Sequence, residues 1–266
     1  MKKYKKIILG MNFIVLNTIG VNLIANDLKN TSYCTNFGPQ SPRNIDNTQG
    51  TNPVIFSQAP SYQNMNLCNI HFHHSAEHQA KAFINLAKDK SGYVCNNSNS
   101  LSQAELKPYN SAVCDNIIPG ETIEVHWVYT SCDVKPGKTL SACVSEKCTN
   151  PNLRVESQIF MVVNDSSALN FNSFDVNEQK ENNYYQAKSL PNKTGFPIVY
   201  IGSTTGGNFN LKTCSPFQVT WSVRPQCTKI NIASLQSWCQ NNIFNEKKPQ
   251  TARELITELN LLSQIK

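Results

Sequence analysis

Histidine is scarce in this sequence, yet four of its five histidines fall within one stretch of ten residues. The stretch covers residues 69–78 and reads NIHFHHSAEH. On a β-strand, side chains alternate between the two faces, so His71 and His73 project from the same side, about 6–7 Å apart. Two imidazoles at that spacing can bind one metal ion.

The fifth histidine, His126, lies in a second segment with strand character, IEVHWVY over residues 123–129. A neighbouring antiparallel strand would bring it beside His71 and His73. Three neutral imidazoles with one position left for water form a catalytic zinc centre, in which the metal lowers the pKa of its water to about 7. Glu124 lies on the same predicted face as His126, where its carboxylate can accept the distal ring N–H of a ligand and fix its tautomer.

Three further residues of the first stretch do not share a simple strand face with His71 and His73. Glu77 and His78 do not follow the alternation that starts at His71, so their placement requires a bend in the chain. A salt bridge for Glu77 and a surface or core position for His78 are the simple structural alternatives. An unbroken strand would direct His74 away from His71 and His73.

The surrounding segments predict a mainly β (α+β) fold. Runs rich in Val, Ile, Phe, Tyr, Trp and Thr, separated by turn-forming residues, favour an antiparallel β-sheet core. The predicted strands cover residues 122–130, 154–163, 197–201 and 217–223. Stretches rich in Asn, Ser and Asp predict long surface loops, over residues 26–50, 95–102 and 164–193.

The end of the chain has a helical pattern. Thr251 and Glu254 form a capping box. Apolar residues then recur at helical spacing, at Leu255, Ile256, Leu259 and Leu262. We therefore expect a C-terminal helical extension over about residues 247–266 that packs against the domain.

The first residues predict an export signal. Four lysines within the first six residues precede an uncharged, largely apolar run to residue 25, which is typical of a signal peptide over residues 1–25. An uncleaved anchor is the alternative, but three asparagines interrupt the run. We expect residues 26–266 to form a single secreted or periplasmic domain, with no stable membrane insertion after removal of the signal.

Charge and cysteine content restrict the partners and the compartment. Without the four leader lysines the net charge falls from +6 to +2, and no dense basic stripe remains, so we expect no nucleic-acid partner. All ten cysteines follow the leader, which favours disulfides formed in an oxidising compartment. Cys143 can pair with Cys148, and Cys214 with Cys227 or Cys239, but the connectivity stays open. Nothing in the composition argues against an oligomer.

At the histidine motifs the sequence resembles the carbonic anhydrases. HFH at 71–73, AEH at 76–78 and EVH at 124–126 follow the order of the alpha-class His-x-His, Ser-Glu-His and Glu-Leu-His elements. Both stretches are still more similar to the delta class, whose members carry Asn-x-His-x-His-x-x-Ala-Glu-His and Glu-Val-His-Trp-Val-Tyr-x-Ser-Cys-Asp. The resemblance runs over about residues 68–221 and implies a sheet core similar to that of the alpha class.

This resemblance implies a carbonic anhydrase (carbonate dehydratase), a lyase that reversibly hydrates carbon dioxide to bicarbonate and a proton. The nucleophile would be a zinc-bound hydroxide. The zinc would be bound by His71, His73 and His126. Val128 and Trp221 would line the apolar pocket for carbon dioxide, with ordinary core packing as their alternative. No histidine precedes His71, so no residue there matches the alpha-class proton shuttle. His74 is the candidate proton relay in its place, although an unbroken strand would direct it away from His71 and His73.

A third element extends the resemblance. YIGSTT at 200–205, followed by VTW at 219–221, is similar to the alpha-class stretch with paired threonines. Carried over, Thr204 would accept a hydrogen bond from the zinc hydroxide and donate its proton to Glu77, and Thr205 would help to hold bicarbonate. One residue is missing before the threonine pair, so either threonine is a candidate for the gate. A glycine-rich turn is the structural alternative for both.

Two other functions compete with hydration. A cupin-like metalloenzyme would use all four of His71, His73, Glu77 and His126 as ligands to iron or manganese. Met65 stands where the cupin pattern expects glycine, which argues against this alternative. A non-catalytic zinc-binding secreted domain is the third candidate, but all three predicted zinc ligands are present.

Overall fold

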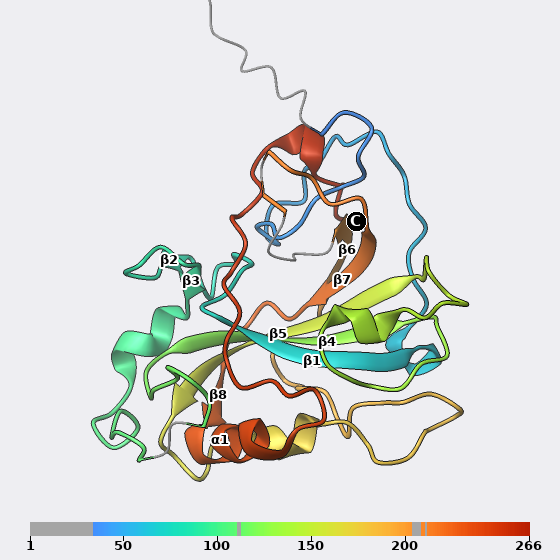
Figure 1. The fold of residues 1–266 in the computed structure, drawn as a ribbon. Helices are drawn as coiled ribbons and strands as arrows, with labels where there is room; N and C mark the ends of the chain where they lie inside the picture. Colours follow the sequence, from blue (N-terminus) through green and yellow to red (C-terminus); the bar gives the residue numbers. More distant parts are fainter. Residues whose placement is uncertain (1–33, 111–112, 204–208, 211) are drawn as a thin grey trace, which may run out of the picture. The chain divides into compact units, whose positions relative to one another are not determined.

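A mixed, six-stranded β-sheet organises the chain in the computed structural model, which describes residues 34–110, 113–203, 209–210 and 212–266 (Figure 1). The strands are β1 (Asn66–His74), β4 (Thr122–Thr130), β5 (Leu153–Val163), β6 (Ile198–Ser203), β7 (Gln218–Val223) and β8 (Thr228–Asn231). A separate small sheet contains β2 (Asn85–Leu86) and β3 (Tyr93–Val94). The single α-helix of the described residues is α1 (Ile232–Asn241). Short 3-10 turns are η2 (Tyr62–Asn64), η3 (Asn96–Ser100), η4 (Leu140–Cys143), η5 (Phe171–Phe174) and η6 (Leu259–Leu261).

The strand order is β1-β4-β5-β7-β6, with β8 also beside β5. The pairs β1–β4, β4–β5 and β6–β7 are antiparallel, whereas β7 and β8 both run parallel to β5. The 11-residue β5 is long enough for its first half to pair with β7 and its second half with β8. The mainly β prediction is confirmed, and the sheet is mixed rather than wholly antiparallel.

The central strand β4 separates two hydrophobic clusters because alternate side chains point to opposite faces. Val125 and Trp127 belong to one cluster, together with Phe72 and with Trp238 of α1. Val128 belongs to the other cluster. Every residue of β4 is buried, so both faces of the sheet are covered where β4 lies. Asn231 begins α1 by accepting a hydrogen bond from the N–H of Ser234 at 2.9 Å.

All ten cysteines form disulfides, as their number and the predicted export signal suggest. The five pairs are Cys34–Cys214, Cys68–Cys143, Cys95–Cys227, Cys114–Cys239 and Cys132–Cys148. None of the pairings suggested from sequence spacing occurs. Four of the five disulfides join residues at least 75 positions apart, so closeness in sequence does not decide the partner.

Residues 247–266, which we call the C-terminal strap, are extended except for the turn η6, so the predicted helix there does not form. The helix of the C-terminal region is α1 instead. Gln250 pairs with the free edge of β1: its N–H donates to Phe72 O at 2.8 Å and its carbonyl accepts from His74 N at 3.1 Å. These hydrogen bonds to a distant strand replace the local ones that a helix would make, despite the helical pattern of the sequence. In Figure 1 the strap is the red segment that passes β1.

Among the described residues, no helix has the length and apolar character needed to cross a membrane. The predicted signal peptide, residues 1–25, lies outside the part of the chain that the structure describes.

Replacing Ile256 with alanine should lower the free energy of unfolding by about 2–5 kcal/mol, because this side chain is 1% exposed and packs beside Leu261 and Leu262. Leu259→Ala should change it by less than about 0.5 kcal/mol, because Leu259 is 39% exposed. A helical strap would place both side chains on one apolar face, and the two losses would then be similar. Urea unfolding followed by circular dichroism measures both variants.

Candidate metal centre

The register of β1 and β4 brings three histidines together. His71 lies directly opposite His126, and His73 lies two residues further along the same face of β1. The ring centroids are 5.0 Å apart for His71 and His126, 5.2 Å for His71 and His73, and 4.7 Å for His73 and His126. One nitrogen from each buried ring lies within 4.8 Å of the other two. These are the three histidines predicted as metal ligands.

The hydrogen-bond partners of His71 and His126 define which nitrogens are free. His71 Nδ1 lies 2.7 Å from the Asn69 Oδ1 acceptor, so Nδ1 carries the proton and Nε2 keeps its lone pair. His126 Nε2 lies 2.9 Å from Glu124 Oε1, so Nε2 carries the proton and Nδ1 keeps its lone pair. The two lone-pair nitrogens face each other at 3.2 Å.

His73 completes the set. Its Nδ1 lies 3.4 Å from the carbonyl oxygen of Thr251 on the C-terminal strap and donates to it. Its Nε2 is buried and has no hydrogen-bond partner among the described residues. Three lone pairs that converge in a buried site repel one another unless a cation lies between them. The arrangement therefore fits a metal ion held by His71 Nε2, His73 Nε2 and His126 Nδ1.

Burial keeps the three imidazoles neutral, as metal ligation requires. Burial, followed by the nearby rings of His126 and His73, lowers the pKa of His71 well below 6.5. Burial and the neighbouring His126 lower the pKa of His73 to about 3. The pKa of His126 is lowered as well, because burial outweighs the opposing effect of Glu124.

Glu124 is a buried carboxylate surrounded by donors. Its Oε2 accepts from the main-chain N–H groups of Glu77 at 2.7 Å and His78 at 3.1 Å. Its Oε1 accepts from His78 Nδ1 at 2.6 Å and Ser157 Oγ at 2.6 Å, in addition to His126. Burial acts to raise the pKa of Glu124, but His78 and His126 outweigh it and hold the pKa well below 4.5. Glu124 therefore orients His126 as an anion.

The hydrogen-bond chain continues away from the histidines. His78 Nε2 accepts from the hydroxyl of Tyr200 at 2.6 Å, and that hydroxyl lies 2.8 Å from Ser41 Oγ. The sequence predicts no contact between His78 and Tyr200, because no local pattern indicates that residues 122 positions apart meet. The one sequence signal that includes His78 is the Ala-Glu-His motif at residues 76–78.

Glu77 is not placed as a fourth ligand. Its Oε1 accepts from the main-chain N–H of Arg253 at 2.7 Å and lies 3.4 Å from His73 Nδ1, the nitrogen that faces away from the cluster. Among the described residues, the candidate ligand group that contains His71 and His73 has His126 as its third member and does not include Glu77. This geometry disfavours the cupin-like arrangement, in which Glu77 would be a ligand.

The other predicted site residues fall in three places. Val128 and Trp221 line a cavity of about 420 Å³ together with His71 and His126. His74 lies on the opposite face of β1, with its Nε2 3.3 Å from Glu121 Oε1, and is only half-buried. Thr204 and Thr205 lie outside the described residues. The rest of the cavity wall is largely apolar and includes Leu140, Val144, Leu153, Val155, Phe209 and Phe217.

A family model described as delta carbonic anhydrase matches residues 62–234, which include both histidine stretches and more than half of the chain. The chain belongs to the delta carbonic anhydrase family. As a carbonic anhydrase it is a lyase that acts on carbon dioxide and bicarbonate, and its buried histidine cluster is consistent with a metal site for hydration. Its five disulfides indicate an extracytoplasmic protein.

No curated protein matches this carbonic anhydrase. Among solved structures, it is similar to a hyperthermostable carbonic anhydrase from an active hydrothermal vent chimney, with 15% identity over 88% of this chain and 90% of the other and a TM-score of 0.36. The Thermovibrio ammonificans alpha-carbonic anhydrase in complex with the inhibitor sulfanilamide shows 14% identity over 84% of each chain and a TM-score of 0.35. The Photobacterium profundum alpha-carbonic anhydrase shows 14% identity over 87% of this chain and 92% of the other, with a TM-score of 0.34.

Glu124→Gln should weaken zinc binding by about 10–100-fold, because it removes the anion that orients His126. Competition with a chromophoric chelator measures the affinity. Glu121→Gln is the matched control, since Glu121 contacts His74 on the other face of β1 and should leave zinc affinity unchanged. Equal affinities in the two variants would contradict the assigned role of Glu124.

The metal-free protein should lose stability as the pH falls below about 6.5. The folded-state pKa values of His71, His73 and His126 lie below 6.5, so the unfolded chain takes up protons first and is favoured by acid. As the pH falls below 6.5, each histidine lowers the free energy of unfolding by up to about 1.4 kcal/mol per pH unit, until the pH reaches its folded-state pKa. Urea unfolding at several pH values measures this slope, which should be shallower in His73→Asn. A stability independent of pH between about 5 and 7 would contradict it.

Proposed function

We propose that this protein hydrates carbon dioxide reversibly with a zinc ion bound by His71, His73 and His126. The observation that carries this proposal is the convergence of three neutral imidazole nitrogens, within 4.8 Å of one another, beside a largely apolar cavity that His71 and His126 line. Zinc, when bound, supplies a Lewis acid that lowers the pKa of a coordinated water to about 7. Nitrogen ligands without a carboxylate suit zinc better than magnesium or calcium.

Each ligand is oriented by a partner that fixes its proton. Asn69 holds His71, the carbonyl of Thr251 holds His73, and Glu124 holds His126. Hydrogen-bond acceptors at the distal nitrogens raise the basicity of the imidazoles and prevent the rings from rotating. The Glu124 anion also offsets part of the positive charge of the ion.

The cavity supplies the binding site for carbon dioxide. Val128 and Trp221 are proposed to hold this apolar molecule beside the metal, and the remaining apolar wall excludes competing water. Trp221 is itself fixed, because its Nε1 donates to Ser203 O at 3.0 Å.

Glu77 is proposed to accept the hydroxyl proton of a gate threonine, with Thr204 and Thr205 as the two candidates and the second of them binding bicarbonate. The N–H of Arg253 holds the Glu77 carboxylate in the buried site at 2.7 Å. His74 is proposed to take no part in proton transfer, because it lies on the opposite face of β1 beside Glu121. Buffer would then receive the proton.

We also propose that the protein is exported from the cytoplasm. Residues 1–25 would act as a cleaved export signal, and the single domain over residues 26–266 would work in the periplasm or outside the cell. Five disulfides support an oxidising location.

Stopped-flow hydration of carbon dioxide tests the proposal, with wild-type protein measured beside His126→Ala and with metal content determined for both. The wild type should contain zinc and be active, and His126→Ala should lose at least about 100-fold in kcat/KM together with its zinc. Equal activity in both proteins would refute the site. Iron with oxygen uptake would support the cupin-like alternative, and zinc binding without hydration would support a non-catalytic domain.

A further inference from the structure

Residues 131–149, which we call the wall loop, lie between β4 and β5 and form part of the apolar cavity beside the metal centre. The loop residues that line the cavity are Leu140, Cys143, Val144 and Thr149. The strand residues that line it, apart from the two histidines, are Val128, Leu153, Val155, Val219 and Trp221. The sheet fixes the strand residues, whereas the wall loop contains only the turn η4 and one isolated bridge, so other contacts must hold it in place.

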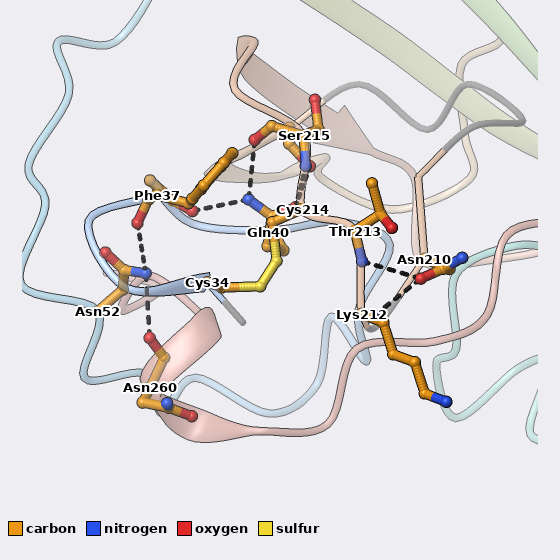
Figure 2. Close-up of a disulfide and its surroundings, with 12 residues drawn as sticks. Cys34, Phe37, Gln40, Asn52, Asn210, Lys212, Thr213, Cys214, Ser215 and Asn260 are labelled. Atoms are coloured by element: carbon orange, nitrogen blue, oxygen red, sulfur yellow. Dashed lines mark hydrogen bonds between the residues drawn. A yellow bond between two sulfur atoms is a disulfide. The ribbon is translucent and has the colours of Figure 1, made fainter. Parts of the chain in front are cut away.

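Most of the wall loop is not packed into the core. Cys143 is the only buried residue between positions 133 and 149, all of which the structure describes. Its sulfur is bonded to Cys68 of β1, so the one buried point of this stretch is also a covalent one. Of the ten cysteines, all within the described part of the chain, Cys143 alone lines the cavity. The Cys34–Cys214 disulfide in Figure 2, for comparison, belongs to a separate cluster of buried residues.

The wall loop is attached to β1 at the point where the pairing of β1 with β4 is irregular. The register shifts between Leu67 and Asn69, so Cys68 is left out of the described pairing with β4. The carbonyl of Cys68 accepts from Gly137 N at 3.0 Å, and its sulfur binds Cys143. Asn69 Nδ2 donates to Gly137 O at 3.0 Å. Two adjacent residues of β1 therefore hold the loop through three contacts.

The same loop is attached to β4, the strand that carries His126. Thr130, the last residue of β4, donates from Oγ1 to Cys143 O at 2.7 Å. The Cys132–Cys148 disulfide closes the base of the loop directly after this strand. Cys143 is therefore held to β1 by its sulfur and to β4 by its carbonyl. Because β1 and β4 also carry the three candidate metal ligands, these two contacts set the position of the cavity wall relative to the metal centre.

We propose that the Cys68–Cys143 disulfide is a positioning element for hydration, which holds the wall loop at the cavity and keeps competing water out of it. For its effect on rate, this inference rests on the proposed function. Without the cross-link, conformational entropy favours a loop that leaves the sheet, because no other buried side chain holds residues 133–149. Water would then enter beside His71 and His126, which line the same cavity, and weaken the binding of carbon dioxide.

Two double variants test the cross-link. Cys68→Ala/Cys143→Ala removes the proposed element, and Cys95→Ala/Cys227→Ala removes another long-range disulfide, whose cysteines do not line the cavity. In stopped-flow hydration the first variant should lose at least about 10-fold in kcat/KM at full zinc content. The second, as the matched control, should lose less than about threefold.

A second pair of variants keeps every disulfide and decides the question if a double variant does not fold. Thr130→Val removes the hydroxyl that holds Cys143 O. Thr122→Val, at the other end of β4, removes a hydroxyl that accepts from Cys95 N at 3.0 Å. Both threonines are buried, with 0% and 2% exposed. Thr130→Val should lose about fivefold in kcat/KM, and Thr122→Val less than about twofold.

A third measurement needs no metal, because xenon enters dry apolar cavities. In the metal-free wild type, the methyl resonances of Val128 and Val155, which line the cavity, should shift with xenon pressure in NMR spectra. Those of Val162, in the other hydrophobic cluster, serve as the internal reference. The xenon-induced shift should fall at least about threefold in the first double variant and stay unchanged in the second.

The outcomes separate the inference from the proposed function. With an active wild type, Cys68→Ala/Cys143→Ala and Thr130→Val that each lie within about twofold of their controls in kcat/KM would overturn the inference alone. A loss of activity that follows loss of zinc would overturn it too, as would an unchanged response to xenon. A zinc-loaded wild type without hydration activity would overturn the proposed function and the effect on rate, and the xenon comparison would still test whether the cross-link holds the wall.

Discussion

The cross-strand pairing of His71 with His126 is the constraint on which the rest of the site depends. A slip of one residue between β1 and β4 would turn one histidine toward the opposite cluster of the core. The register is fixed because β4 is buried on both faces and pairs with β5 on its other side. The register is regular from Asn69 onward, so Asn69, two residues before His71, lies on the same face of β1, where its side chain reaches the ring.

The buried Glu124 anion lies beside His126 of this pair. Neutral imidazoles and a buried anion are costly unless each polar atom has a partner. Glu124 obtains its partners from β4, from β5 through Ser157, and from the bend at residues 77–78. The bend that the sequence required for Glu77 and His78 therefore serves to direct two main-chain N–H groups at one carboxylate. The nitrogens of the three histidines that do not bond these partners converge in the centre, where they can bind a metal ion.

The C-terminal strap contacts both the edge of the sheet and the residues of the metal centre. Through Gln250 it pairs with Phe72 and His74 at the end of β1, which protects this part of the strand edge from pairing with other chains. Its carbonyl at Thr251 and its N–H at Arg253 reach His73 and Glu77. An extended strap can present both groups to the site because its backbone is not occupied by helical hydrogen bonds. The same stretch thus closes the sheet and orients two residues of the centre.

Local patterns in the sequence were sufficient to predict the clustering of His71, His73 and His126, the proximity of Glu124 to His126 and the mainly β architecture. The alternation of His71 and His73 and the spacing of Glu124 and His126 follow from strand geometry alone. The tertiary structure decided the disulfide partners, the meeting of His78 with Tyr200, and the path of residues 247–266. Each of these depends on contacts between segments far apart in the chain, and such contacts outweighed the helical propensity of the last segment because they satisfy its backbone groups and bury its apolar side chains at once.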